Sequence, residues 1–334
     1  MPAPLPPDFR PRYHELHRVG RPGWWRSLLG AVVLVLLVFG VVPLFLGLLA
    51  LAAMVAGGTS AGDAGAFLDI TAEVTPAGLA ALNLLLGSAI LSSWLVLWLF
   101  HRLKPRWLSS VAPRIRWRFL LACLPLAVVA LVASLGASLL VPMGDVGEPI
   151  GAMNDFTSTT RDFILVILLL TPLQAAGEEY VFRGYLTQAF GSLLPFRRVS
   201  LVLAVLVPAV LFAIAHGSGQ SWPVFFDRFA FGVVAGILVI RTGGLEAAIA
   251  MHVLNNFFAY GLALSFGDMT ESLNASGPTS PWMIVGTLAQ SLVYLGLASW
   301  VAKAMGLPDA GPPVGGALPP AGSDPVLAVP PPRV

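Results

Sequence analysis

Charged residues are scarce in this chain: Asp, Glu, Lys and Arg make up 11% of its 334 residues, whereas hydrophobic residues make up 57%. A soluble domain carries about 25% charged residues, so this composition excludes an ordinary soluble fold and indicates several membrane spans. The chain has one cysteine, Cys123, which excludes an internal disulfide and leaves thiol chemistry without a partner. We expect Cys123 to be a small buried apolar residue.

Signals of several other protein classes are also missing. The sequence contains no glycine-rich phosphate loop, no zinc-finger spacing, no HExxH motif and no long basic tract, so we expect no nucleic acid among its partners. It also has no convincing inverted repeat, which leaves a proton-coupled transporter as a weak alternative. We expect no cleavable signal peptide, because the first apolar run is longer than a signal h-region.

Apolar segments long enough to cross about 30 Å of hydrocarbon recur along the chain. They predict an all-α fold, a polytopic membrane bundle of about eight transmembrane helices, in which the fifth and sixth are short or interrupted. The segments cover residues 28–56, 78–100, 118–142, 163–193, 198–216, 223–241, 245–264 and 282–303.

The charges of the loops predict the orientation. Arginine and lysine gather before the first span, after the second span and in later loops on the same side, whereas the alternate loops are acidic. The positive-inside rule then puts both termini in the cytoplasm. We expect three parts: a basic, proline-rich cytosolic tail (1–27), a transmembrane bundle (28–304) and a proline-rich, disordered cytosolic tail (305–334).

Several polar side chains fall inside the apolar helices, where such groups are costly and mark functional sites by default. Glu179 and Arg183 have i,i+4 spacing with the acid first, so they can neutralise each other. Glu178 is one position away and lacks that partner, so we expect it to face a polar cluster. The full set is Glu178, Glu179, Arg183, His216, His252 and Asn256.

The depths of these groups agree. At ~1.5 Å rise per residue, Glu178 and His216 both stand roughly 24–28 Å from the turn that joins their helices. His252 lies well inside the next-but-one helix, and Asn256 follows one turn later on the same face. Each residue alone could have a structural role, such as a packing histidine or an interhelical amide. Their occurrence at matching depths favours one shared site.

The other ionisable residues are expected to be ordinary. Asp227, Arg228 and Glu246 lie near helix ends, where solvated or snorkelled charges are common. Of the remaining histidines, two lie in the N-terminal tail and His101 lies in a basic loop.

The chain resembles the CAAX protease and bacteriocin-processing (CPBP) family of intramembrane proteases, which includes type II CAAX prenyl endopeptidases and bacterial abortive-infection proteins. Three motifs carry the resemblance, each in an apolar helix and in the family's order. They are EExxxR as EEYVFR (178–183), FxxxH as FAIAH (212–216) and HxxxN as HVLNN (252–256). The resemblance covers roughly residues 160–265.

The resemblance implies a multi-pass endopeptidase of a bacterial plasma membrane that cuts near the membrane surface. Glu178 would activate a water molecule, and His216 would help to hold and deprotonate it. His252 and Asn256 would donate hydrogen bonds to the oxyanion. Glu179, Arg183 and Phe212 would support the site.

Three points stay open. Glu178, His216 and His252 also have the His₂Glu composition of a catalytic zinc site, and the family has been described both as a metalloprotease and as a metal-independent glutamate protease. Because no HExxH is present, we favour the glutamate mechanism. The substrate would be a membrane-associated peptide or protein, with a lipidated C-terminus or a bacteriocin-type leader, reached in the lipid bilayer. The alternative function is a non-catalytic bacteriocin-immunity or membrane scaffold protein of the same fold.

Overall fold

The computed structural model describes residues 8–68, 72–140, 152–217, 219–274 and 280–314, and its regular structure in these ranges is helical apart from two isolated β-bridges. Eight segments are long and apolar enough to cross a membrane. The prediction of an all-α bundle of eight spans is therefore confirmed, whereas its orientation stays a prediction. The spans are Trp24–Ala56, Pro76–His101, Trp117–Ser138, Ser158–Gly191, Arg197–Ala215, Trp222–Thr242, Glu246–Phe266 and Met283–Ala304.

These spans are built from α-helical and π-helical segments. The fifth span is the shortest, with 19 residues, and the sixth runs without interruption for 21. In chain order the elements are η1 (Tyr13–Arg18), α1 (Trp24–Leu36), η2 (Leu37–Val41), α2 (Val42–Ala56), α3 (Ala61–Leu68), α4 (Pro76–His101), η3 (Pro105–Leu108), α5 (Trp117–Ser138), α6 (Ser158–Glu179), η4 (Tyr180–Leu186), α7 (Thr187–Gly191), α8 (Arg197–Ala215), α9 (Trp222–Thr242), α10 (Glu246–Phe266), α11 (Met269–Asn274) and α12 (Met283–Ala304).

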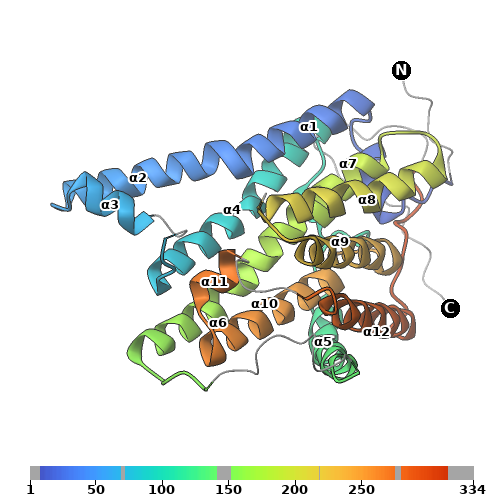
Figure 1. Cartoon of the computed structure of the whole chain (residues 1–334). Helices are drawn as coiled ribbons and strands as arrows, with labels where there is room; N and C mark the ends of the chain where they lie inside the picture. The colour runs from blue at the N-terminus through green and yellow to red at the C-terminus, as the bar shows by residue number, and fades with distance from the viewer. Residues whose placement is uncertain (1–7, 69–71, 141–151, 218, 275–279, 315–334) are drawn as a thin grey trace.

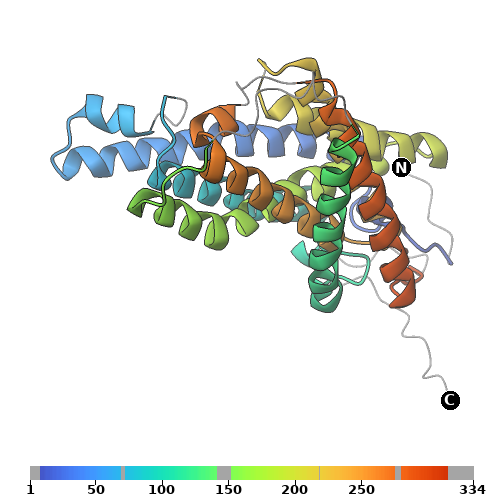
Figure 2. The ribbon, with the colours of Figure 1, turned by 60° about the horizontal axis from the view of Figure 1, so that its bottom comes forward.

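The helices form a bundle with one projecting rod. Within the bundle α4 packs on α6, α5 on α12 and α8 on α9, and Figure 2 shows α5 and α12 running side by side. Segments α1, η2 and α2 form a long rod that carries α3 away from α5 and α12 (Figure 1). Because α2 has no buried side chain, its apolar surface is suited to contact with lipid.

Local signals in the sequence explain where the main helices begin and end. The Thr75 hydroxyl accepts a 3.0 Å hydrogen bond from the Gly78 amide, and Pro76 occupies the first turn of α4. The hydroxyl of Thr157 caps α6 in the same way. Both are common N-terminal devices, because they satisfy or remove amides that lack a partner within the helix. Gly243 ends α9 with a left-handed φ of 70°, which favours glycine.

The described part of the N-terminal segment packs against the bundle, and its cytosolic location stays a prediction. Tyr13 and Leu16 in η1 are fully buried, because the short helix directs both side chains into the core. The Gly311 amide donates to the Pro11 carbonyl, and Val314 donates to Phe9. Part of the C-terminal tail is thus paired with residues 9–12, whereas residues 315–334 lie outside the described structure.

Three histidines that we expected outside the bundle are buried in it. His14, His17 and His101 are each at most 1% exposed. The rings of His17 and His101 stack with their centroids 3.8 Å apart. The expectation that His101 lies in a loop is wrong, because it is the last residue of α4. His17 and His101 are buried together because η1 folds back onto the end of α4.

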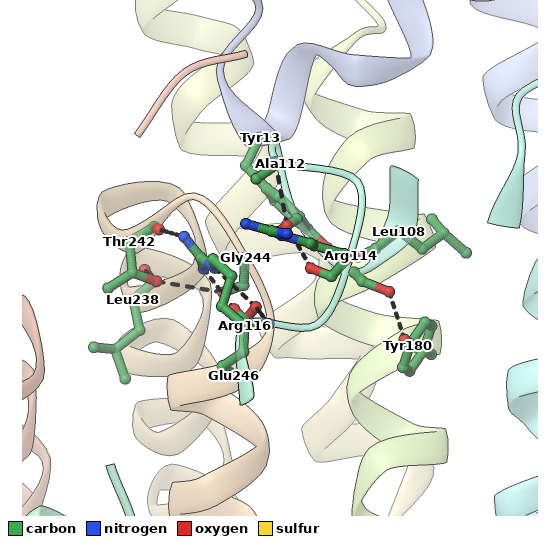
Figure 3. A network of polar contacts seen from close by, with 12 residues as sticks. Tyr13, Leu108, Ala112, Arg114, Arg116, Tyr180, Leu238, Thr242, Gly244 and Glu246 are labelled. Carbon is green, nitrogen blue, oxygen red and sulfur yellow. Dashed lines mark hydrogen bonds and ion pairs between the residues drawn. The ribbon is translucent and has the colours of Figure 1, made fainter. Parts of the chain in front are cut away.

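A polar network holds the 105–117 connection against two other elements (Figure 3). Arg116 makes a two-pronged ion pair with Glu246, with Nε–Oε1 at 2.8 Å, and donates to the Thr242 carbonyl at 2.7 Å. Glu246 is fully buried, so the expectation of a solvated charge there is wrong: its partner lies 130 positions earlier in the chain. The Ser109 hydroxyl pairs with the Tyr180 hydroxyl at 2.7 Å, which ties this network to the residue after Glu179.

Candidate active site

The helix that carries the EExxxR motif changes its winding directly after the two glutamates. α6 ends at Glu179 and continues as the π-helical segment η4, in which all seven residues are buried. A π segment widens the helix by one residue per turn, and such segments are frequent at functional sites. The change in winding therefore sets the direction of Arg183 relative to Glu179.

A close contact between two helices sets the depth of the glutamates. A side chain added at Gly177 would collide with the Leu86 carbonyl of α4, and one added at Gly87 would collide with Leu173 of α6. Small residues let the backbones of membrane helices approach each other. Gly177 thus allows α6 to press against α4 immediately before Glu178.

Glu179 is the centre of the buried charges. Its Oε1 accepts hydrogen bonds from Arg183 at 3.0 Å and from Nδ1 of His252 at 2.8 Å. Glu179 and Arg183 are fully buried. The pairing predicted from the i,i+4 spacing is therefore present, and the same carboxylate also holds a histidine from α10, which the sequence did not indicate.

Glu178 has one anchored oxygen and one free oxygen. Its Oε1 accepts a 2.6 Å hydrogen bond from the Gln174 side chain. Its Oε2 is buried without a hydrogen-bond donor in the described part of the chain and lies 3.6 Å from Nε2 of His252. The free oxygen therefore faces the imidazole, as expected for a carboxylate turned towards a polar cluster.

Gln174 is a site residue that we did not predict. Its amide nitrogen donates to Glu178, and its amide oxygen accepts from the Asn256 side chain at 2.8 Å. One side chain thus bridges the carboxylate of α6 and the amide of α10. The available signal was its position, one helical turn before Glu178 and on the same face.

His216 reaches the site from the end of α8. Its Nδ1 lies 2.7 Å from the Phe212 carbonyl. The Phe212 ring stands edge-on to both histidines, with centroids 4.5 Å from His216 and 5.8 Å from His252. Glu178 is close enough to act electrostatically on His216. Phe212 is therefore the packing link between the second and third motifs.

Two arginines lie near this histidine: Arg183 contacts the Phe212 ring, and Arg228 contacts the chain around His216. The Arg183 guanidinium lies over the Phe212 ring at 4.1 Å from its centroid, within the range of a cation–π contact. Arg228 donates to the Gln220 side chain at 2.6 Å and approaches the His216 carbonyl at 3.5 Å. Gln220 in turn donates to the Ala213 carbonyl at 2.6 Å. Arg228 is thus part of the hydrogen bonding that holds the chain after His216, rather than a solvated end charge.

The structure gathers the predicted residues into one region. Glu178, Glu179, Arg183, His252 and Asn256 belong to one group of polar contacts, completed by Gln174. His216 has no direct hydrogen bond to these described side chains. It is connected to the group by its contact with the Phe212 ring and by the electrostatic effect of Glu178.

The zinc alternative does not fit this arrangement. Within the described ranges, no group of three or more His, Cys, Asp or Glu side chains is placed to hold a metal ion. Nε2 of His252 and Oε2 of Glu178 face each other, but His216 does not complete a three-ligand set with them. The arrangement therefore supports no reaction step through a metal.

The hydrogen bonds assign one nitrogen of each histidine. A carbonyl oxygen only accepts, so Nδ1 of His216 carries hydrogen and Nε2 is an acceptor in the neutral ring. Nδ1 of His252 likewise donates to the Glu179 carboxylate. Nε2 of His252 donates only when the ring is an imidazolium, whose two N–H groups would face Glu179 and Glu178. The two histidines can thus act as an acceptor and, when charged, as a donor.

Comparison with known proteins agrees with the motifs. Residues 160–258 match the family model described as "Type II CAAX prenyl endopeptidase Rce1-like". The chain is 29% identical over 163 residues to the Uncharacterized protein YyaK of Bacillus subtilis (strain 168), covering 46% of this chain and 53% of that protein. It is 32% identical over 97 residues to the Membrane-embedded CAAX protease MroQ of Staphylococcus aureus (strain USA300), covering 29% and 37%.

A third relative, an Uncharacterized 24.3 kDa protein of Escherichia coli, is 29% identical over 119 residues, covering 36% of this chain and 52% of that protein. The chain therefore spans about half or less of the length of these relatives. No solved structure matches this chain. The family match includes all three motifs of the described site. Residues 160–258 of this multi-pass membrane protein are therefore similar to the type II CAAX prenyl endopeptidase Rce1-like family.

Proposed function

We propose that this protein is an intramembrane endopeptidase that hydrolyses a peptide bond near the membrane surface, with Glu178 as the general base. The observation that supports this most is the environment of Glu178. One oxygen is held by Gln174, while the other is buried, without a donor in the described part of the chain, and faces His252. A positioned base with a free lone pair is what the activation of water requires.

The proposed reaction moves one proton through Glu178. The carboxylate takes a proton from water while the water oxygen bonds to the carbonyl carbon of the scissile peptide. Nε2 of His216, an acceptor in the neutral ring, would help to hold the water. When the C–N bond breaks, the protonated Glu178 gives its proton to the leaving amine. The products are a carboxylic acid and an amine, and no metal or cofactor takes part.

The oxyanion formed on the way would accept hydrogen bonds from α10. Asn256 uses one N–H group on Gln174, and its second N–H is available for the oxyanion. His252 donates from Nε2 when it is an imidazolium, held by Glu179. Preorganised donors of this kind are each worth roughly 2.7–4 kcal/mol in a site that excludes water. The substrate would be a membrane-associated peptide, with either a lipidated C-terminus or a bacteriocin-type leader.

The test is a cleavage assay of the full chain in lipid bilayers with peptides of both kinds. Glu178→Gln keeps the shape of the side chain but removes the base, so we expect kcat/KM to fall by about 10²–10⁴-fold. Asp162→Asn is the matched control, because this carboxylate lies on the same helix and is paired with Arg161 on the exposed surface. The control should keep full activity.

Two results would contradict the proposal. Cleavage by Glu178→Gln at the wild-type rate would exclude the role of Glu178. If the wild type cuts none of the peptides, the alternative of a non-catalytic immunity or scaffold protein gains support. The same assay in the presence of a chelator, with the metal content of the protein measured, distinguishes the glutamate mechanism from a zinc mechanism. Activity that persists in metal-free protein supports the glutamate mechanism.

A further inference from the structure

A groove opens between α9 and α12 near the ends of both helices. It has a volume of about 420 Å³, and no residue of the candidate active site lines it. The two helices pack along each other (Figure 1). Its lining residues are Arg241, Leu292, Leu295, Gly296, Ser299, Trp300 and Lys303.

Two cations line this groove. Arg241 lies in the last turn of α9 and Lys303 in the last turn of α12, and both are exposed. Across the residues that the structure describes, neither side chain makes an ion pair or a hydrogen bond. Basic residues near helix C-termini can be explained by the helix dipole, but the dipole does not explain why the two border a common groove.

The groove also contains an unsatisfied hydroxyl. The Oγ atom of Ser299 is buried and has no hydrogen-bond partner in the described part of the protein. A buried hydroxyl without a partner is destabilising, and Ser299 is one of the residues that line the groove.

The other residues that line the groove are mostly apolar. Leu292 and Trp300 are 61% and 67% exposed, and Leu295 and Gly296 lie between them. No atom lies within 4 Å of a side chain added at Gly296, so the groove is open there. Tryptophan is enriched at membrane–water interfaces, which suits Trp300 in the last turn of a membrane-spanning helix.

We propose that this groove binds one anionic phospholipid. The phosphate would lie between Arg241 and Lys303, and an acyl chain would follow the leucines along α12. Basic pockets between transmembrane helices bind anionic headgroups in this way. A free phosphate ion would use the cations but would leave the apolar walls uncovered, so the geometry points to the lipid. This inference does not depend on the proposed protease function.

The experiment is native mass spectrometry of the full chain from bilayers that contain equal amounts of phosphatidylglycerol and phosphatidylcholine. We expect the wild type to retain phosphatidylglycerol in preference to phosphatidylcholine. In Arg241→Gln/Lys303→Gln we expect retention of phosphatidylglycerol to fall by about 10- to 30-fold, since each surface cation contributes modestly to anionic-lipid binding. The charge-preserving pair Arg241→Lys/Lys303→Arg should retain the lipid, which separates loss of charge from loss of fold.

Arg197→Gln/Arg198→Gln is the matched control. It removes the same charge from two exposed residues on the same predicted side of the membrane but outside the groove, and it should leave the preference unchanged. Three results would overturn the proposal: equal retention of both lipids by the wild type, an equal loss in the control pair, or displacement of phosphatidylglycerol by millimolar inorganic phosphate. Quenching of Trp300 by brominated phosphatidylglycerol, taken as the difference from Trp300→Phe, should locate the lipid in the groove.

Discussion

Nδ1 of His252 lies 2.8 Å from Oε1 of Glu179, so the second glutamate of the motif orients the imidazole that faces the first. The same oxygen accepts from Arg183. Glu179 therefore joins an ion pair within one helix to a histidine on another. In the proposed mechanism Glu178 meets the substrate, and Glu179 positions His252.

Replacing Glu179 should harm both stability and activity, for different reasons. Glu179→Gln leaves the buried Arg183 charge uncompensated, which should lower the free energy of unfolding by about 3–5 kcal/mol. It also weakens the hold on His252, so kcat should fall. Thermal unfolding and peptide cleavage measure the two effects.

The double variant Glu179→Gln/Arg183→Met separates these effects. Removing both charges should restore part of the lost stability, while cleavage stays low because His252 still lacks its charged acceptor. Full recovery of activity in the double variant would show that Glu179 serves only to neutralise Arg183.

Gln174 should be needed for turnover more than for folding. Gln174→Met keeps the volume but removes the bonds to Glu178 and Asn256, at 2.6 and 2.8 Å. With the base and the oxyanion donor no longer aligned, we expect kcat/KM to fall by about 10- to 100-fold, equivalent to about 1–3 kcal/mol. Steady-state cleavage kinetics measure this loss.

Thr171→Val is the matched control for Gln174, since it removes a buried 3.0 Å hydrogen bond between Asn83 and Thr171 one turn earlier on the same helix. It should lower the unfolding temperature and leave kcat/KM unchanged. If both variants lose the same activity, the effect belongs to the packing of α6 and not to the bridge made by Gln174.

The α4–α6 contact should not tolerate a methyl group at Gly177. Gly177→Ala drives the new carbon into the Leu86 carbonyl, so we expect a loss of about 1–3 kcal/mol from overpacking and lower cleavage as the glutamates shift. Gly136→Ala in α5 is the control, because nothing lies within 4 Å of its added carbon. If thermal unfolding shows the same loss of stability in both variants, the α4–α6 contact is not the cause of the loss in Gly177→Ala.

Acid should destabilise the packing of the N-terminal segment. Burial lowers the pKa of His14 to about 4 and lowers the pKa of His17 well below its usual value, with the adjacent His101 ring adding to the latter shift. An unfolded histidine titrates near 6.5. Below that pH the unfolded state binds protons that the folded state does not, so stability falls from about pH 6.5 towards 4.

The measurement is the unfolding temperature between pH 8 and pH 5 for the wild type and for His17→Phe. The variant keeps an aromatic ring beside His101 but removes one titrating group, so its unfolding temperature should fall less steeply with pH. Parallel curves for the two proteins would contradict this account of His17.

Much of the architecture follows from local pattern. The eight spans were predictable because a helix must cover about 30 Å of hydrocarbon with apolar residues, and each predicted segment overlaps an observed one. The Glu179–Arg183 pair was predictable because residues four apart lie on one helix face. Polar side chains inside a membrane are energetically costly, so their positions in the sequence indicated the candidate site residues. These are Glu178, His216, His252 and Asn256.

Contacts between distant parts of the chain were not predictable in the same way. Arg116 and Glu246 are separated by 130 positions, and neither carries a local sign of the other. The stack of His17 on His101 depends on η1 folding against the end of α4. A helical pattern records which face is polar but not which helix lies opposite.

Hydropathy and the spacing within single helices were enough to predict the membrane class of this protein, its eight spans and the residues expected to carry its chemistry. Three relationships came only from the packed structure: Glu179 holds His252, Gln174 joins Glu178 to Asn256, and α9 and α12 leave a groove lined by two cations. The physical reason is that these relationships depend on the rotation and depth of each helix against its neighbours, which are set when all the interfaces pack together.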